Sequence, residues 1–317
     1  MKQAEQNKIS LIVVVGPTAS GKTGLSIELA KIFNGEVISA DSMQIYKGID
    51  IGVAKPTKQE MQGISHHLMD FLDVSETFSV AQYVEMAHRC IREVSGRGKM
   101  PIICGGTGLY VDSLLDNVEF QSSKDDIGMR RELQEKAEKY GVQMLINELK
   151  EFDPESAATI HPNNVKRVIR AIEIYRTTGV TMTEQIANSK LSPSPYNPCI
   201  IGLNFDDRNI LYDRINLRVD KMVENGLLDE AKMFLGSNSG ATAIGAIGYK
   251  ELAPYFSGEC DLDEALDKLK TRTRNYAKRQ LTWFRKNENI NWIYVDRYQK
   301  NEDIVNTAAG YIKKTIY

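Results

Sequence analysis

The chain has 317 residues, of which 42% are hydrophobic and 26% charged, and its formal net charge is −2. This is ordinary globular composition, with room for one large domain or two smaller ones. No apolar run is long enough for a membrane span, and the polar residues 1–8 exclude a signal-peptide core. Four cysteines lie far apart without a C-x-x-C pair, so we expect a reduced, cytoplasmic protein without structural zinc.

The first motif is a phosphate-binding loop between a predicted strand and a predicted helix. Residues 9–15 are apolar and mostly β-branched, as in a buried parallel strand, and apolar residues at helical spacing follow from Leu25 to Phe33. Glycines between these elements let backbone N–H groups turn toward an anion, while the lysine supplies a charge and the threonine a hydroxyl for Mg²⁺. The predicted diphosphate-binding residues are Gly16, Pro17, Thr18, Ala19, Ser20, Gly21, Lys22 and Thr23. The alternative is a glycine-rich turn without a ligand.

A second predicted strand, residues 36–40, runs into the segment Asp41-Ser42-Met43-Gln44-Ile45-Tyr46. In an open α/β sheet the C-terminal ends of the strands face the ligand crevice, so we expect Asp41 beside the phosphate loop. The alternative is that Asp41 only caps the following turn.

Residues 52–73 are predicted as a loop that contains His66 and His67. Adjacent histidines on a strand point to opposite faces, so a metal site there is the less favoured interpretation. The capping-box spacing of Ser79 and Gln82 predicts a helix to about residue 94. A third predicted strand, 100–104, ends in the glycine-rich residues 105–110, which we expect to form a second wall of the crevice.

The pattern changes to helical periodicity after about residue 117. Helices are predicted at 129–140, 142–152, 154–160, 165–177 and 182–189. The proline-rich residues 192–198 are a predicted linker, and residues 199–205 are strand-like again. We therefore expect residues 1–117 and 199–317 to form one α/β core domain and residues 118–198 to form a helical insertion.

The C-terminal part is predicted to contain two long helices. The first, 208–225, places Arg214 and Arg218 on one face and ends at Gly226. The second, 262–286, has eight Lys or Arg residues and no acid between positions 268 and 286, with aromatic rings interleaved. Such a face suits phosphates and bases, although the plain alternative is a solvated surface. A short strand at 293–295 and a final helix follow.

Six blocks of this chain resemble the tRNA dimethylallyltransferases (isopentenyl-tRNA transferases), in the family's order and over nearly the whole chain. Asp41–Tyr46 and Tyr276-Ala277-Lys278-Arg279-Gln280 are the most specific blocks; Met69 and Gly108 depart mildly from the family pattern. The other four blocks are residues 16–23, 66–70, 105–110 and 245–249, and residues 273–275 begin the block that ends at Gln280. Because eukaryotic relatives add a C-terminal zinc finger and no cysteine follows Cys260 here, the resemblance is to the bacterial type. It implies a P-loop NTPase-like parallel sheet flanked by helices, with an inserted all-helical domain.

The resemblance also implies an activity: transfer of a dimethylallyl group from dimethylallyl diphosphate to N6 of the adenosine 3′ of the anticodon, position 37, in tRNAs reading codons that begin with U. Lys22, Thr23 with Mg²⁺ and one of Arg214 and Arg218 are expected to act on the diphosphate, and Asp41 to accept the N6 proton. The expected partner is the tRNA anticodon stem-loop, and we expect a monomer. The residues expected to contact tRNA are Asp41, Ser42, Met43, Gln44, Thr107, Arg130, Lys166, Arg167, Arg170, Gly248, Arg272, Arg274, Tyr276, Lys278, Arg279 and Gln280.

Three other functions remain open at the level of sequence. A small-molecule kinase using ATP would explain the phosphate loop and Asp41 but not the aromatic, acid-free helix. A prenyltransferase acting on free adenine nucleotides would share the donor site. A third alternative is an RNA-binding, ATPase-like module without enzymatic activity, in which replacement of Asp41 by alanine would leave every measurable function intact. A GTP switch is disfavoured because the chain has no N-K-x-D motif.

Overall fold

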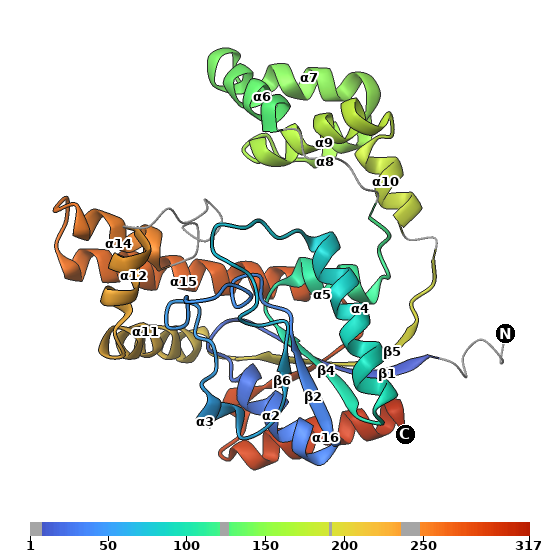
Figure 1. The fold of residues 1–317 in the computed structure, drawn as a ribbon, viewed down its shortest axis with the longest axis vertical. Helices are drawn as coiled ribbons and strands as arrows, with labels where there is room; N and C mark the ends of the chain where they lie inside the picture. Colours follow the sequence, from blue (N-terminus) through green and yellow to red (C-terminus); the bar gives the residue numbers. More distant parts are fainter. Residues whose placement is uncertain (1–7, 121–126, 190–191, 236–247) are drawn as a thin grey trace. The chain divides into compact units, whose positions relative to one another are not determined.

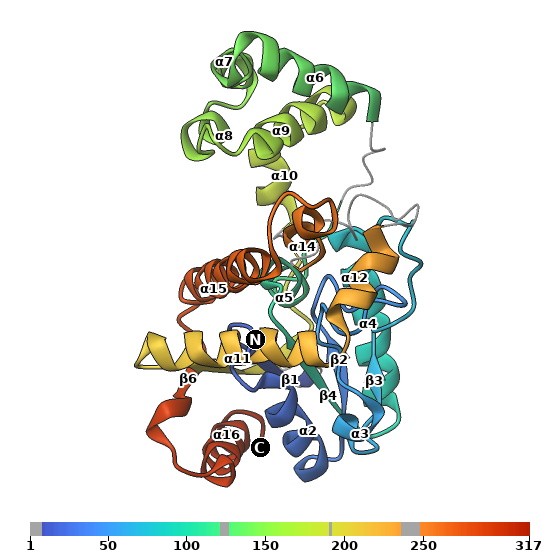
Figure 2. The ribbon, with the colours of Figure 1, turned by 90° about the vertical axis from the view of Figure 1, so that its left-hand side faces the viewer.

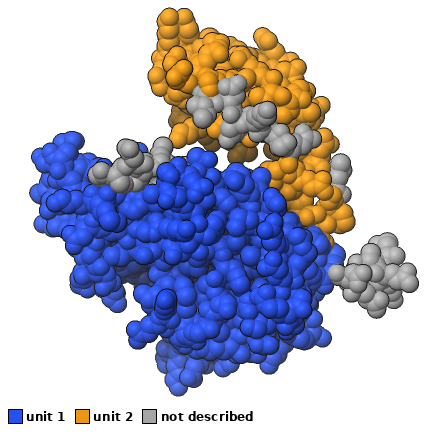
Figure 3. All heavy atoms as spheres, in the orientation of Figure 1, with its two compact units in different colours: residues 1–115, 195–317 blue, residues 116–194 orange. Residues whose placement is uncertain are grey.

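The computed structural model describes residues 8–120, 127–189, 192–235 and 248–317. The chain divides into two compact units, coloured separately in Figure 3: unit 1 comprises Met1–Leu115 and Pro195–Tyr317, and unit 2 comprises Asp116–Ser194. Unit 2 ends before the residue 198 expected from the sequence, because residues 196–198 of the proline-rich segment are already paired in a strand.

Unit 1 is built on a six-stranded sheet in which every pair of neighbouring strands is parallel (Figure 1). The order across the sheet is β3-β2-β4-β1-β5-β6, so β1 and β4 are central. The central strand β1 is buried from Leu11 to Val15, which explains its uninterrupted apolar sequence. The strands are β1 (Ile9–Val15), β2 (Gly35–Ser39), β3 (His66–His67), β4 (Met100–Gly105), β5 (Tyr196–Asn204) and β6 (Ile290–Tyr294).

Helices cover both faces of this sheet (Figures 1 and 2). Helices α2 (Lys22–Ile32) and α16 (Asn301–Ile316) pack on one face, through a core that includes Leu29 and Ile312. Helices α4 (Val80–Gly96), α5 (Gly108–Leu115) and the end of α15 (Leu262–Phe284) pack on the other. The result is the three-layer α/β architecture expected from the alternation of apolar strands and amphipathic helices.

The remaining helices of unit 1 form a separate cluster beyond the C-terminal ends of the strands. Their apolar side chains pack with those of residues 43–53 and with Leu269 of α15 in a third core. These helices are α11 (Arg208–Glu224), α12 (Leu227–Leu235) and α14 (Tyr249–Phe256). Short elements complete the unit: α3 (Lys58–Met61) and the 3-10 helix η1 (Val295–Arg297).

Unit 2 is entirely helical in the residues that the structure describes and has its own apolar core. Leu133, Leu145, Leu149, Val168 and Ile172 are fully buried in it. Its helices are α6 (Ile127–Tyr140), α7 (Val142–Phe152), α8 (Pro154–Thr159), α9 (Val165–Thr178) and α10 (Met182–Ser189). These bounds lie within two residues of those expected from the sequence, because each apolar stripe faces this core.

Besides α3, which lies in the segment predicted as a loop, and the 3-10 helix η1, four further short elements differ from expectation. The structure has a two-residue strand, β3, within a segment predicted as loop, and a helix, α5, where only a glycine-rich turn was expected. Helices α12 and α14 were not predicted either. All four are shorter than ten residues and are stabilised by tertiary packing rather than by a long periodic pattern. The predicted glycine turn at residues 244–249 lies outside the described residues up to residue 247. Across the described ranges, no helix combines the length and apolarity that a bilayer crossing requires.

Candidate active site

The phosphate loop connects the buried end of β1 to the first residue of α2. Gly16 and Gly21 have φ values of +144° and +97°, which favour glycine. A side chain at position 16 would also collide with the main-chain oxygen of Leu203, at 2.6 Å from a built Cβ. Ala19 takes a positive φ of 62° as well. The loop therefore has the tight left-handed turns that aim N–H groups at an anion at the start of a helix.

Lys22 lies at the first position of α2, with its Nζ donating to the main-chain oxygen of Pro17 at 2.7 Å. The pKa of Lys22 is lowered to about 8, chiefly by burial of its ammonium group and also by the neighbouring Arg218, whereas Cys104 and Asp41 oppose the shift. A half-buried lysine with a depressed pKa next to an arginine is a site that an anionic ligand would stabilise. Ser20 is 2% exposed, and among the described residues its hydroxyl has no hydrogen-bond partner.

Asp41 follows β2 at the same edge of the sheet. It both caps the following turn and lies beside the phosphate loop, the two positions expected from the sequence. One of its carboxylate oxygens, Oδ1, accepts the N–H of Met43 at 2.9 Å, so it does stabilise the turn. The same side chain lines a cavity with Lys22 and Thr23 of the phosphate loop. Thr107 links this turn to the end of β4, because its hydroxyl accepts the N–H of Ser42 at 3.0 Å.

The cavity is about 310 Å³ in volume and is lined by both polar and apolar side chains. Residues from the ends of β2 and β4, the phosphate loop and helices α11 and α15 meet in it, although they are far apart in the sequence. The polar side chains that line it include Thr18, Lys22, Thr23, Asp41, Gln44, Arg218, Thr273 and Arg279. The apolar side chains include Ile215, Val219, Met222, Leu227 and Leu269.

The structure separates the two arginines that the sequence left equivalent. Arg218 is half-buried, lines the cavity, and has a pKa lowered by burial, with Asp41 opposing the shift. Arg214 is exposed, stacks on the ring of Phe205 with its guanidinium carbon 5.6 Å from the ring centre, and donates to the main-chain oxygen of Ala19 at 2.9 Å. Arg218 can therefore reach a ligand in the cavity, whereas Arg214 supports the outside of the phosphate loop.

Gln280 occupies a different environment from the one expected for a tRNA contact. It is 5% exposed; its Oε1 accepts the N–H of Thr18 at 2.8 Å, and its Nε2 donates to the main-chain oxygen of Gly106 at 3.0 Å. A Cβ at position 106 would lie 2.0 Å from that Nε2. Gln280 thus joins α15 to the phosphate loop and to the turn after β4. Its neighbour Tyr276 lines the cavity, and burial raises its pKa.

The glycine at position 108, which departs from the family pattern, is explained by Trp283. A Cβ at position 108 would lie 2.3 Å from the indole ring, so only glycine leaves room for it. The indole Nε1 donates to Asp112 Oδ2 at 2.7 Å, which fixes the ring against α5. Trp283 is still 36% exposed.

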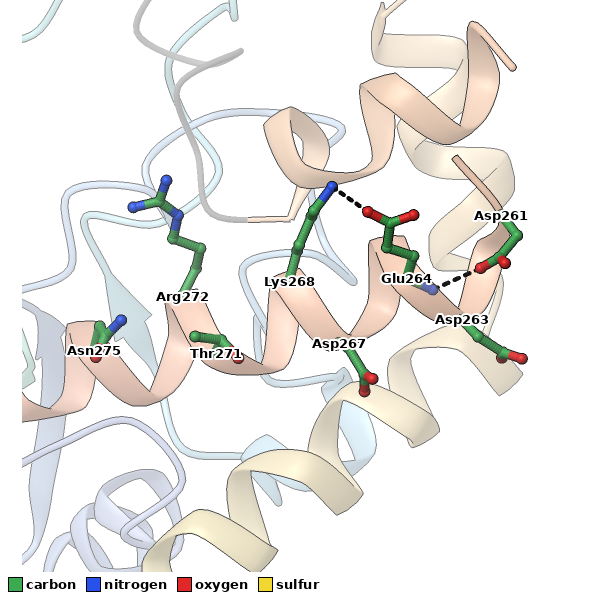
Figure 4. Close-up of a pocket in the computed structure, with 8 residues that line it drawn as sticks. All are labelled: Asp261, Asp263, Glu264, Asp267, Lys268, Thr271, Arg272 and Asn275. Carbon is green, nitrogen blue, oxygen red and sulfur yellow. Dashed lines mark hydrogen bonds and ion pairs between the residues drawn. The ribbon is translucent and has the colours of Figure 1, made fainter. Parts of the chain in front are cut away.

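The cations of α15 divide into two groups, and the sequence expectation of eight uncompensated charges is wrong for the first. Lys268 pairs with Glu264 at 2.8 Å and Lys270 with Asp220 of α11 at 2.6 Å. Figure 4 shows this first half of α15: Lys268 reaches Glu264, Asp261 accepts the N–H of Glu264 at the start of the helix, and Asp267 points to the opposite side. The acids come from the preceding turn and from a neighbouring helix, so the local sequence between 268 and 286 could not reveal them.

Further along, Arg272 points away from this acidic end (Figure 4) and lies 4.0 Å from Glu251 of α14. Arg274 donates to Asn216 at 2.7 Å. In the second half of the helix and just beyond its end, cations lie over aromatic rings: Lys278 over Tyr212, Arg279 over Tyr276 and Lys286 over Trp283. The exposed, aromatic-backed cations therefore begin at about residue 278.

In unit 2, two of the arginines expected to contact tRNA pair with a buried carboxylate. Arg130 and Arg170 bind Glu173, which is 0% exposed, at 2.9 and 2.8 Å. Their own side chains remain 41% and 37% exposed, so the ion pairs hold them at the surface. Lys166 and Arg167 are exposed at the start of α9.

The structure also places Gly248, an expected tRNA contact, and the adjacent histidines His66 and His67, for which a metal site was the less favoured interpretation. Gly248, with φ +127°, is buried and lines the cavity immediately before α14. His67 binds the buried Glu36 at 2.7 Å, and His66 hydrogen-bonds the main-chain oxygen of Ile64 at 2.9 Å. These two histidines thus serve local packing at β3.

Sequence reasoning missed the apolar wall of the cavity and one loop. Ile215, Val219 and Met222 have the spacing of an ordinary core-facing helix stripe, so nothing in the pattern separates a ligand wall from a core. Residues 52–54, which also line the cavity, have no chemical signature beyond a glycine.

The chain is similar to known proteins over most of its length. A family model described as IPP transferase matches residues 44–287. A tRNA dimethylallyltransferase of Halalkalibacterium halodurans is 49% identical over 311 residues, covering 97% of this chain and 99% of the relative. One from Thermoanaerobacter sp. strain X514 is 47% identical over 308 residues, covering 96% and 98%.

Solved structures give the same result. The tRNA isopentenylpyrophosphate transferase of Bacillus halodurans has a TM-score of 0.70 and 47% identity, and the match covers 97% of this chain and 98% of that one. A eukaryotic dimethylallyltransferase acting on tRNA has a TM-score of 0.80 and 31% identity, covering 96% and 80%. With the phosphate loop, Asp41 and α15 assembled around one cavity, these likenesses show that the chain belongs to the tRNA dimethylallyltransferase (IPP transferase) family.

Proposed function

We propose that this protein transfers a dimethylallyl group from dimethylallyl diphosphate to N6 of adenosine 37, the nucleotide 3′ of the anticodon, in tRNAs that read codons beginning with U. The observation that carries the proposal is the meeting of Asp41 with Lys22, Thr23 and Arg218 around one cavity. A carboxylate and a diphosphate site in one enclosure are what a transfer from an allylic diphosphate to an amine requires.

The donor diphosphate would lie against the phosphate loop. The N–H groups at the start of α2, the Lys22 ammonium and the Arg218 guanidinium would bind its oxygens and stabilise the charge that grows on pyrophosphate as it leaves. Because these groups are fixed before the donor arrives, little reorganisation accompanies the reaction. The apolar wall formed by Ile215, Val219 and Met222 offers the dimethylallyl group a surface free of competing water.

The residues also suit a Mg²⁺ ion. The Thr23 hydroxyl supplies an oxygen ligand at the cavity, and Mg²⁺ typically takes one or two protein oxygens together with substrate phosphates and water. Bound there, Mg²⁺ would neutralise charge on the diphosphate.

The target adenine would be extruded from the anticodon loop and enter from the side of Asp41. As the N6 amine attacks the allylic carbon, the C–N bond forms, the C–O bond to the diphosphate breaks, and Asp41 accepts the N6 proton. The exposed cations of α15 and those of unit 2 would hold the stem-loop phosphates.

A single experiment tests the proposal. Purified protein is incubated with unmodified tRNA, Mg²⁺ and either dimethylallyl diphosphate or ATP, and the nucleosides beside the anticodon are identified by mass spectrometry. We expect a dimethylallyl adduct on adenosine 37 with the first donor only. Phosphoryl transfer from ATP, or equal activity on free AMP and on tRNA, would contradict the proposal.

A further inference from the structure

The loop of residues 50–55, of which 52–54 line the cavity, is held at one end by Glu230 and at the other by Lys55. On one side, Glu230 of α12 accepts three consecutive main-chain N–H groups: those of Asp50 and Ile51 on Oε2, at 2.8 and 2.9 Å, and that of Gly52 on Oε1, at 2.7 Å. A carboxylate that accepts several backbone N–H bonds fixes the backbone that donates them.

Tyr249 completes this anchor. Its hydroxyl donates to Glu230 Oε1 at 2.6 Å, and the residue is 0% exposed. Burial and the adjacent carboxylate raise the pKa of Tyr249, so it remains a donor. The Tyr249 ring also lies 2.9 Å from where a Cβ on Gly52 would be, so the loop and the ring are in direct contact.

Lys55 anchors the other end of the loop. Its side chain is 7% exposed and binds Asp50 at 2.7 Å and Asp70 at 2.8 Å. The N–H of Lys55 donates to the main-chain oxygen of Asp50 at 2.9 Å, which closes the turn, and Ala54 adopts φ 47° within it. These contacts hold the backbone of loop 50–55 in a compact turn.

The carbonyl groups of this loop determine how the Gln44 amide is oriented. Gln44 Nε2 lies 3.2 Å from the main-chain oxygen of Ala54 and 3.4 Å from that of Val53. Since carbonyl oxygens only accept, the amide nitrogen must face them. Oε1 accepts from the Ser39 hydroxyl at 3.2 Å, and Gln44 lines the cavity. Its oxygen keeps a second lone pair for a ligand.

We infer that Glu230 is a positioning residue for base selection: it holds loop 50–55 so that Gln44 presents its amide oxygen, an acceptor, to the exocyclic amine of the target purine. This inference rests on the proposed function and deepens it. Adenine offers an N6–H₂ donor at that position, whereas a 6-oxo purine offers an acceptor, which would repel Gln44 Oε1. Selection by a fixed acceptor fails when the amide is free to turn.

The test measures discrimination between adenosine and inosine in binding, separately from the rate of the reaction. Anticodon stem-loops with adenosine or inosine at the target position are titrated against the protein, and the ratio of their dissociation constants is determined. For the wild-type protein we expect the dissociation constant for inosine to exceed that for adenosine by about tenfold or more, because two hydrogen-bond acceptors, Gln44 Oε1 and the 6-oxo group, would face each other without a shared proton. In Glu230→Ala we expect the ratio to fall to within about threefold of that in Gln44→Met, which has no amide.

Turnover provides the second readout. Glu230→Ala should lower kcat on tRNA by about 10- to 100-fold through misplacement of the base, with KM for dimethylallyl diphosphate within about threefold of wild type. Glu230→Gln, which keeps an acceptor for part of the loop, should give intermediate values. Asp229→Asn, an exposed acid on the same helix, is the matched control and should behave as wild type.

Thermal unfolding of each variant guards against a purely structural effect. If Glu230→Ala does not fold, the ratio of dissociation constants for adenosine and inosine is measured in Glu230→Gln and Tyr249→Phe instead. An unchanged adenosine-to-inosine ratio in folded variants, or a KM for the donor that rises in step with the loss of kcat, overturns the inference. Absence of prenylation by the wild-type protein would instead refute the proposed function, so the two failures are distinguishable.

Discussion

Asp41 has two roles that compete for one carboxylate: Oδ1 accepts the N–H of Met43 at 2.9 Å, while the side chain lines the cavity beside Lys22. Replacing it with asparagine keeps an acceptor for that N–H but removes the base. We expect Asp41→Asn to lower kcat by about 10²-fold or more, with tRNA affinity within about threefold of wild type.

Single-turnover kinetics and a tRNA binding titration measure the two effects separately. Asp73→Asn is a suitable control, because Asp73 makes the same kind of turn, with the N–H of Ser75 at 2.9 Å, on an exposed loop. Wild-type turnover in Asp41→Asn would remove Asp41 from the chemistry.

The depressed pKa of Lys22, about 8, predicts a pH dependence of donor use. Below that pKa the side chain is charged and attracts the diphosphate; above it the charge is lost. We therefore expect kcat/KM for dimethylallyl diphosphate to be level below about pH 8 and to fall at higher pH with a slope approaching −1 on a log scale. The profile of Lys22→Arg, whose guanidinium stays charged, should lack this alkaline limb at whatever activity remains. A wild-type profile that is flat to pH 10 is incompatible with this role.

Arg218 and Arg214 allow a matched comparison on one face of α11. Arg218 lines the cavity, while Arg214 is exposed and binds the main-chain oxygen of Ala19. We expect Arg218→Gln to lower kcat/KM for the donor by about 10- to 100-fold and Arg214→Gln by only a few-fold. Steady-state kinetics at saturating tRNA decide between them, and equal losses would mean that both reach the diphosphate.

At the scale of elements, α15 changes character along its length. Its first lysines, Lys268 and Lys270, are neutralised by Glu264 and Asp220, whereas Lys278 and Lys286 are exposed and lie over aromatic rings. Of these four lysines, we expect only Lys278 and Lys286 to neutralise tRNA phosphates and so release counterions on binding. The element therefore joins the cavity, through Tyr276 and Arg279, to a cationic surface.

This difference predicts the salt dependence of tRNA binding. The double variant Lys278→Ala/Lys286→Ala should make the slope of log K against log salt shallower by about 1 to 2. The double variant Lys268→Ala/Lys270→Ala, in the same helix, should leave it nearly unchanged because those charges are already paired. Equal changes of slope in the two variants would show that the ion pairs open on binding.

At the scale of the whole molecule, the two units have separate cores. The core of unit 2 comes from its own helices, with Leu145, Leu149 and Ile172 fully buried, while unit 1 buries the two faces of its sheet. We expect a fragment of residues 116–194 to fold alone, with a helical circular dichroism spectrum and a cooperative thermal transition. Leu149→Ala should lower its stability by about 2–5 kcal/mol. A fragment without cooperative unfolding would contradict the independence of this core.

Most of the architecture followed from local pattern. Strand β1 and helices α7 and α10 begin and end at the predicted residues, since a buried parallel strand and a one-sided helix have distinctive periods. The phosphate loop was evident because its glycines and lysine lie next to one another in the chain. Elements such as β3 and α12 were missed because they depend on pairing and packing with distant residues.

What the sequence determined by itself is the chemistry available: a phosphate loop, a carboxylate at a strand end and a cationic helix with aromatic residues. Only the tertiary structure decided which of these meet. It brought Arg218 rather than Arg214 into the cavity, buried Gln280 against Thr18, and paired Lys268 and Lys270 with acids from other segments. The reason is physical: residue type and spacing specify local structure, whereas charge compensation and cavity walls arise between segments that only folding places together.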